Sequence, residues 1–171
     1  MPGIGDTSVL PATTCPPPSI GLGELTALTR RIAIEVRAGL HDVPIDPDRR
    51  WYRQLSSAGG ADVWLIGWAT GQATELHDHG GSLGALTVVS GVLAEHRWAP
   101  HRGGIRSRRL RAGRSQGFRL GHVHDVVNPG VLPAVSVHAY SPPLTVMSYY
   151  AVVPGAVALR RLRTIPDGLP G

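Results

Sequence analysis

The sequence predicts one all-β domain, a sandwich or barrel of about ten short strands that follows an N-terminal helical segment. Two observations support this prediction. From residue 47 onward, apolar residues recur with a period of two in short runs, and many of the 22 glycines and 15 prolines stand between these runs as turns. The chain has 171 residues, 42% of them hydrophobic, which suffices for one domain with a real core.

The elements follow in order along the chain. Residues 1–20 carry five prolines and no hydrophobic periodicity, so we expect a flexible leader. Leucines and isoleucines at helical spacing, from Leu22 to Ile32, predict one or two amphipathic helices in a segment at 21–46. Residues 47–171 form the predicted β-barrel domain, with a short last element after Pro154. Its expected strands are 51–57, 61–69, 74–79, 84–91, 92–99, 104–112, 115–120, 122–128, 134–141 and 145–153.

The composition of the chain argues against nucleic-acid and membrane partners. The net charge is +5 and every basic residue is arginine, with eight arginines between residues 97 and 119, but few aromatic residues accompany them. We therefore expect no nucleic-acid partner. No apolar run reaches a membrane span and no signal peptide is evident, so we expect no membrane partner and a cytoplasmic location. The lone Cys15 allows no internal disulfide. A monomer or small homo-oligomer is expected.

His77 and His79 are the first candidate metal ligands. Side chains at i and i+2 of a strand lie on one face, about 7 Å apart, so two imidazoles can bind one ion. Asp78 points to the opposite face and is interpreted as a structural carboxylate. The pair alone fits a solvent-facing or core strand equally well.

Spacing supplies further evidence. The arrangement of Gly71, His77, His79, Gly84 and Gly91 follows the first cupin motif, except that Gly84 replaces the usual glutamate ligand. A second cupin motif contains Gly113, Arg119, Gly121, His124 and Asn128, with Arg119 in place of the usual proline. Two matches, each with a ligand histidine, indicate a cupin double-stranded β-helix, a jelly-roll barrel that holds a metal inside.

The predicted ligands are thus His77, His79 and His124, all neutral. Imidazole suits iron, zinc, copper and nickel alike, so the ligand type does not choose the metal. His122 faces the same side of its strand as His124 and is the rival third ligand, but the spacing to Asn128 favours His124.

The segments HDHGGSLGALTVVSG, HDVVN and SVHAYSPP together resemble the cysteine dioxygenases, including bacterial thiol dioxygenases, over roughly Trp51 to Pro143. The resemblance implies one non-haem Fe(II) per chain, held by the three histidines. It also implies that L-cysteine and O2 are the substrates and that both oxygen atoms go to sulfur, giving cysteine sulfinate.

Alternation places Ser136, His138 and Tyr140 on one strand face, where they can form a hydrogen-bonded chain. The resemblance implies that this chain lies beside the iron and that Tyr140 meets the thiolate or the oxygen. A neutral phenol can donate a hydrogen bond to charge developing on oxygen. The alternative is a tyrosine whose hydroxyl is satisfied locally in a buried strand.

The resemblance assigns substrate binding to Arg53, which would grip the carboxylate as a bidentate fork. A register slip of one residue would instead place Gln54 there, as in relatives that oxidise 3-mercaptopropionate. Animal members carry at Gly84 a cysteine cross-linked to the tyrosine, so we expect an uncross-linked Tyr140. The alternatives are a dioxygenase of another small thiol such as 3-mercaptopropionate, and a non-catalytic metal-binding cupin.

Overall fold

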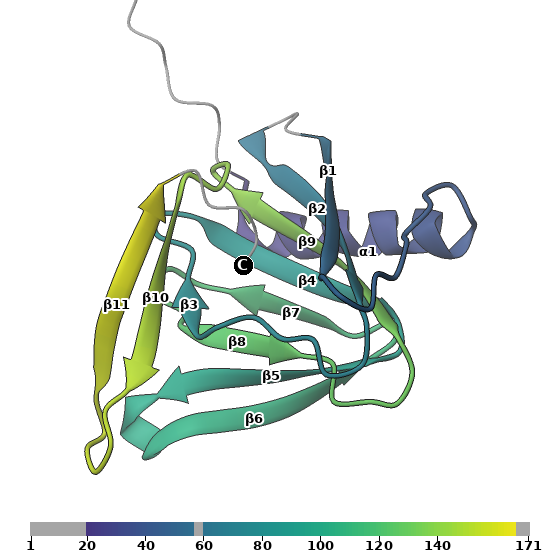
Figure 1. Cartoon of the computed structure of the whole chain (residues 1–171). Coiled ribbons are helices and arrows are strands. Elements are labelled where there is room, and N and C mark those ends of the chain that lie inside the picture. Colours follow the sequence, from purple (N-terminus) through teal and green to yellow (C-terminus); the bar gives the residue numbers. More distant parts are fainter. Residues whose placement is uncertain (1–19, 57–59, 167–171) are drawn as a thin grey trace, which may run out of the picture.

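The computed structural model describes residues 20–56 and 60–166, in which two antiparallel sheets face each other and one α-helix packs outside them (Figure 1). The first sheet has the order β1 (Trp51–Ser56), β2 (Asp62–Trp68), β9 (Ala134–Ser141), β4 (Leu83–Ser90), β7 (Ser115–Phe118). The second has the order β11 (Leu159–Pro166), β10 (Val146–Val152), β3 (His77–Asp78), β8 (His124–Val127), β5 (Val92–Ala99), β6 (Gly104–Arg111). This architecture confirms the predicted fold class, an all-β jelly roll.

Helix α1 (Leu22–Arg37) covers the outer face of the first sheet, beside β4 and β9 in Figure 1. Its buried residues Leu25, Thr29 and Ala33 recur every four positions, which places them on one side of the helix. The Thr29 hydroxyl lies 2.8 Å from that of Thr87 in β4, inside this contact. The helix thereby forms a second apolar layer outside the barrel, which explains why β2 is buried on both faces.

The main core fills the space between the two sheets. In β2, Trp64, Ile66 and Trp68 point into it, whereas Val63 and Leu65 point toward α1. The inner core consists of Trp64, Ile66, Trp68, Leu86, Val88, Leu93, Leu110, Phe118, Val126, Ala134, Tyr140, Leu144, Met147 and Tyr149. Four buried histidines interrupt this apolar interior, and they mark the site described below.

The expected elements are present with small differences. The helix expected within 21–46 is α1, and each expected run contains a strand. β3 has only two residues instead of six, because the Asp78 carboxylate accepts a hydrogen bond from the Gly80 amide and turns the chain there. β11 is a full strand paired with β10, longer than the short last element expected.

The predicted leader, apart from Ile20, lies outside the described residues, as does Cys15. Among the helices of the described part, none is long and apolar enough to cross a membrane.

Candidate metal centre and active site

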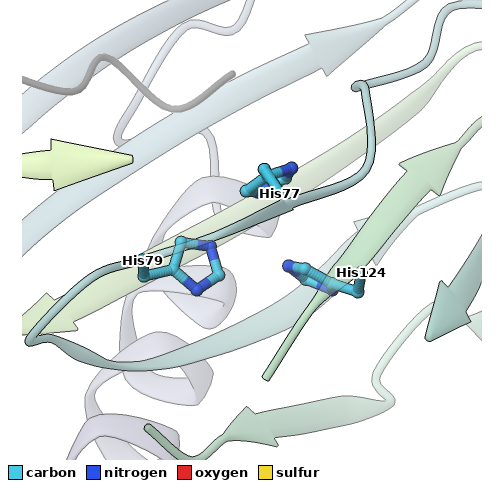
Figure 2. A group of neighbouring side chains, drawn as sticks. All are labelled: His77, His79 and His124. Atoms are coloured by element: carbon cyan, nitrogen blue, oxygen red, sulfur yellow. The ribbon is translucent and has the colours of Figure 1, made fainter. Parts of the chain in front are cut away.

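Three buried histidines meet inside the barrel. His77 lies in β3, and His79 is the first residue after that strand. His124 begins the neighbouring strand β8, where it is the register partner of His77. None is more than 4% exposed. One ligand nitrogen from each lies within 4.8 Å of the others, and Figure 2 shows the rings turned toward one another. The structure thus brings together the three histidines of the two motifs, in a metal-binding triad.

Hydrogen bonds determine which nitrogen each imidazole presents. His77 Nδ1 donates to the Glu75 carbonyl oxygen at 2.7 Å, and His124 Nδ1 donates to the Glu95 carboxylate at 3.1 Å. Each of these rings therefore keeps the lone pair of Nε2. His79 Nε2 is buried and has no hydrogen-bond partner among the described residues. A buried polar atom without a partner is costly, and a metal ion at this point would satisfy it, so the residues present fit the implied ion.

The protonation states agree with this assignment. Burial, reinforced by the neighbouring His124, lowers the pKa of His77 to about 3. Burial lowers the pKa of His79 well below its ordinary value and lowers that of His124 as well, although Glu95 opposes the shift at His124. All three rings are therefore neutral at pH 7, the form in which imidazole binds a metal.

The triad carries no carboxylate. Asp78 turns away from it: one oxygen accepts from the Gly80 amide and the other accepts from the Tyr150 hydroxyl at 2.6 Å. Gly84 faces the site from β4, but a Cβ there would lie 2.8 Å from Phe118 Cδ2 and 3.0 Å from Tyr140 Cδ1. Two aromatic rings therefore occupy the space that a side chain at position 84 would need. A metal bound here keeps its full positive charge, which favours anionic ligands.

Glu95 in β5 is the carboxylate that is hydrogen-bonded to the triad, and its partner there is His124. Its Oε1 accepts hydrogen bonds from His124 Nδ1 and from His122 Nε2, the latter at 2.8 Å. Burial alone would raise the pKa of Glu95, but these hydrogen bonds outweigh it and hold the pKa well below its usual range. The rival ligand His122 is thus bound to Glu95, with its ring stacked on Phe118 at 5.1 Å.

Ser136, His138 and Tyr140 line β9 on the barrel side. His138 Nε2 lies 3.0 Å from Ser136 Oγ, and His138 Nδ1 lies 3.3 Å from the Tyr140 hydroxyl. Trp68 Nε1 donates to Ser136 Oγ at 2.9 Å. All three residues of the strand are buried, and the Tyr140 ring centroid is 4.8 Å from that of His79. The chain that strand alternation predicted is formed, and it ends at the triad.

One direction of this chain satisfies every member. The Trp68 N–H takes one lone pair of the Ser136 oxygen, and the serine hydroxyl can donate its own hydrogen to His138 Nε2. With the serine as donor, His138, whose pKa burial lowers to about 3, is neutral and carries its proton on Nδ1, from which it donates to Tyr140 Oη. Burial raises the pKa of Tyr140 far above its ordinary value. Tyr140 therefore stays protonated and has its own hydrogen free to donate into the site.

The structure does not bring Arg53 to the triad. In β1, Arg53 pairs with Leu65, and its neighbours Trp51 and Leu55 pack on the layer beneath α1. The Arg53 side chain is exposed and donates to the Asp42 carbonyl at 3.4 Å. Gln54 lies on the opposite, barrel-side face, where its amide donates to an Asp62 carboxylate oxygen at 2.8 Å.

Arg50 is the arginine that approaches the site. Its guanidinium lies 5.2 Å from the Trp68 ring and donates to the Ala73 carbonyl at 2.9 Å. Its charge acts on Tyr140, His77 and His138, and burial lowers its own pKa. Trp68 in turn lines the inner cavity, together with Thr74, His77, His124, His138 and Tyr140.

The sequence model of the cysteine dioxygenase type I family matches residues 40–152. The chain belongs to the cysteine dioxygenase type I family. Its matched segment contains the triad, Glu95 and the Ser136–His138–Tyr140 chain. No protein of curated function matches the sequence significantly. The resemblance in the motifs is thus confirmed at the level of the family.

Solved structures share the fold. The TT1209 protein from Thermus thermophilus is 19% identical with a TM-score of 0.52, covering 58% of this chain and 90% of its own. A conserved double-stranded β-helix protein from Klebsiella pneumoniae is 20% identical with a TM-score of 0.51, covering 71% and 90%. Oxalate oxidase in complex with glycolate is 23% identical with a TM-score of 0.50, covering 57% of this chain and 53% of its own. These likenesses show the double-stranded β-helix fold.

Two residues of this family member's site were missed by sequence reasoning. Glu95 lies in an ordinary alternating strand, and nothing near it in sequence indicates a partner 29 residues away. The sequence did offer one signal for Glu95: strand alternation places it on the same inward face as Leu93 and Arg97. Arg50 precedes its strand directly and shares the parity of Tyr52 and Gln54, which distinguishes it from Arg53.

Proposed function

We propose that the chain is an iron-dependent thiol dioxygenase that converts L-cysteine and O2 to cysteine sulfinate. The observation that carries the proposal is the junction of a neutral three-histidine triad with the Ser136–His138–Tyr140 chain. Ferrous iron bound by the triad would supply the electron exchange that lets O2 react with a thiolate and would bind both substrates. In the overall reaction the thiolate sulfur gains both oxygen atoms and is oxidised, while O2 is reduced.

The chain's own residues prepare this reaction. The triad adds no negative charge, so the anionic sulfur of the substrate is attracted to the centre. Tyr140 donates its free hydroxyl hydrogen to charge that develops on sulfur or oxygen, and it needs no solvent reorganisation to do so. Trp68, Ser136 and His138 fix the orientation of that hydroxyl. The apolar surroundings of Ile66 and Val126 keep water away from the cavity.

Arg50 is proposed to bind the substrate carboxylate, in place of Arg53. It directly precedes β1 and lies over the ring of Trp68, which points into the barrel, whereas Arg53 points to the outer face. A guanidinium held in place by an aromatic ring and a backbone carbonyl offers a fixed fork to a carboxylate. A substrate with its thiolate at the triad and its carboxylate at Arg50 would thus be held at two points.

A second candidate substrate is 3-mercaptopropionate. The observation that favours it is the barrel-side position of Gln54, the residue that relatives acting on this thiol present. It carries the same thiol and carboxylate as cysteine but no amine. The triad and Tyr140 would serve either substrate in the same way.

The test is oxygen uptake by Fe(II)-loaded protein offered L-cysteine, 3-mercaptopropionate and cysteamine separately, with product masses recorded. We expect uptake with cysteine and a product heavier by two oxygen atoms. A clear preference for 3-mercaptopropionate would keep the reaction and change the substrate. If iron binds stoichiometrically and no thiol consumes oxygen, the dioxygenase proposal is overturned and the chain is a non-catalytic metal-binding cupin.

A further inference from the structure

We propose that an arginine-lined cavity at the edge of the barrel binds a small tetrahedral oxyanion, a phosphate, sulfate or phosphate monoester. The cavity has a volume of about 260 Å³ and is separate from the active-site cavity. Its charged lining residues are Glu95, Arg97, Arg102, Arg106 and Arg108. Gln116 of β7, the last strand of the first sheet, also lines it, beside residues of β6, the last strand of the second sheet.

The sheet register explains how the arginines converge. In the antiparallel pair β5–β6, Arg97 lies directly opposite Arg106, and Glu95 lies opposite Arg108. Residues directly opposite share a face, so these four side chains continue the inner face that Leu93 and Leu110 begin in the core. Arg102 comes from the short turn η2 (Pro100–Arg102) that joins the two strands.

The positive charges of this cavity are poorly balanced. Like charges directly opposite on a sheet repel, and the Arg97–Arg106 pair is of this kind. The one carboxylate, Glu95, is already bound through Oε1 to His122 and His124, and its Oε2 lies 3.4 Å from Arg108. Among the described residues, the Arg97 and Arg102 side chains have no hydrogen bond or ion pair. An anion between them would remove the repulsion.

The geometry also indicates the class of anion. Guanidinium groups bind phosphate and sulfate oxygens in pairs, so several forks around one cavity suit a tetrahedral anion with several acceptor oxygens. The cavity volume of about 260 Å³ leaves room for such an ion or for a small ester. The nearby Arg109 points to the other face of β6, opposite Ala94, and does not line this cavity.

Isothermal titration calorimetry with inorganic phosphate, sulfate and glycerol phosphate tests the proposal, at constant ionic strength set with sodium chloride. We expect one saturable site with a sub-millimolar dissociation constant for at least one of these anions. Tighter binding of glycerol phosphate than of either inorganic ion would identify an ester as the ligand. No saturable heat with any of the three would overturn the proposal.

Matched variants locate the site. The double variant R97Q/R106Q should weaken binding at least tenfold, and R102Q in the turn should weaken it severalfold. R109Q on the opposite face should bind as the original chain does.

H79A should retain the affinity for the anion, because His79 lies in the metal centre and not in this cavity. Loss of binding in H79A would place the anion at the metal centre and overturn the proposal. An equal loss in R109Q would show nonspecific attraction. Binding of a single-stranded oligonucleotide without phosphate binding would also overturn it, in favour of a nucleic-acid surface.

Discussion

Glu95 Oε1 joins two imidazoles, at 2.8 Å from His122 Nε2 and 3.1 Å from His124 Nδ1. This carboxylate is 1% exposed, so its hydrogen bonds form in a dry interior where they are strong. It fixes the tautomer of His124 and turns that ring's Nε2 toward His77 and His79. A carboxylate behind a ligand histidine orients the ring and raises its basicity.

E95Q should therefore bind ferrous iron about 10- to 100-fold more weakly, the usual effect of losing such a carboxylate. The amide keeps the shape but loses the charge and offers its two imidazole partners a weaker acceptor. Competition with a coloured ferrous chelator measures the affinity. The control is E75Q, because the Glu75 side chain is exposed and His77 uses only its backbone carbonyl. Equal iron affinity in E95Q and the original chain would refute the orienting role.

His124 and His122 should differ in their effect on iron content. H124A removes one of three ligands and should leave well under one iron per chain after reconstitution and desalting. H122A removes only a partner of Glu95 and should retain most of the iron. Metal analysis of the two purified variants decides, with circular dichroism to verify folding. Full iron in H124A, or its loss in H122A alone, would reverse the assignment.

Tyr140 should carry no thioether cross-link. The cross-strand position beside it is Gly84, and Cys15 is the only cysteine in the chain. Intact mass spectrometry of the purified protein should give the full calculated mass, and a deficit of two hydrogens would contradict this expectation.

G84A should destabilise the fold by about 1–3 kcal/mol, because its Cβ would press on Phe118 and Tyr140. Denaturant titration measures that loss.

R50Q should raise the KM for the carboxylate-bearing substrate about 10- to 100-fold, as expected for lost charged hydrogen bonds of about 1.5–3 kcal/mol. R53Q makes the same chemical change three residues away on the outer face and should leave KM unchanged. Binding of cysteamine, which has no carboxylate, should be the same in both variants. A rise in KM with R53Q and not with R50Q would return the carboxylate to Arg53.

The fold, the three-histidine triad and the Ser136–His138–Tyr140 chain could be predicted from the sequence because they depend on local rules. Strand alternation alone places Ser136, His138 and Tyr140 on one face, and motif spacing selects His124 over His122. Local rules could not decide which face of β1 points into the barrel. Trp51 and Leu55 flank Arg53 on one face, and Tyr52 lies beside Gln54 on the other, so both faces carry apolar residues. Which of them meets the core depends on α1, which packs over one side. The link from Glu95 to His124 likewise depends on the pairing of β5 with β8, which no local pattern encodes.

The metal-free protein should lose stability as pH falls below about 6.5. Burial lowers the pKa values of His77 and His138 to about 3, whereas in the unfolded chain both titrate near 6.5. Between these values the unfolded state binds more protons, so acid favours unfolding. Each histidine contributes about 1.4 kcal/mol of destabilisation between roughly pH 7.5 and 5.5.

Urea denaturation of metal-free protein at these two pH values measures the effect. The original chain and H101Q, which changes an exposed histidine in η2, should lose the same stability. H138Q should lose less, because it removes one of the buried imidazoles whose pKa the fold lowers. Equal stability of the original chain at both pH values would show that His77 and His138 accept protons in the folded state. Their neutral form, on which the direction of the hydrogen-bond chain to Tyr140 depends, would then be excluded.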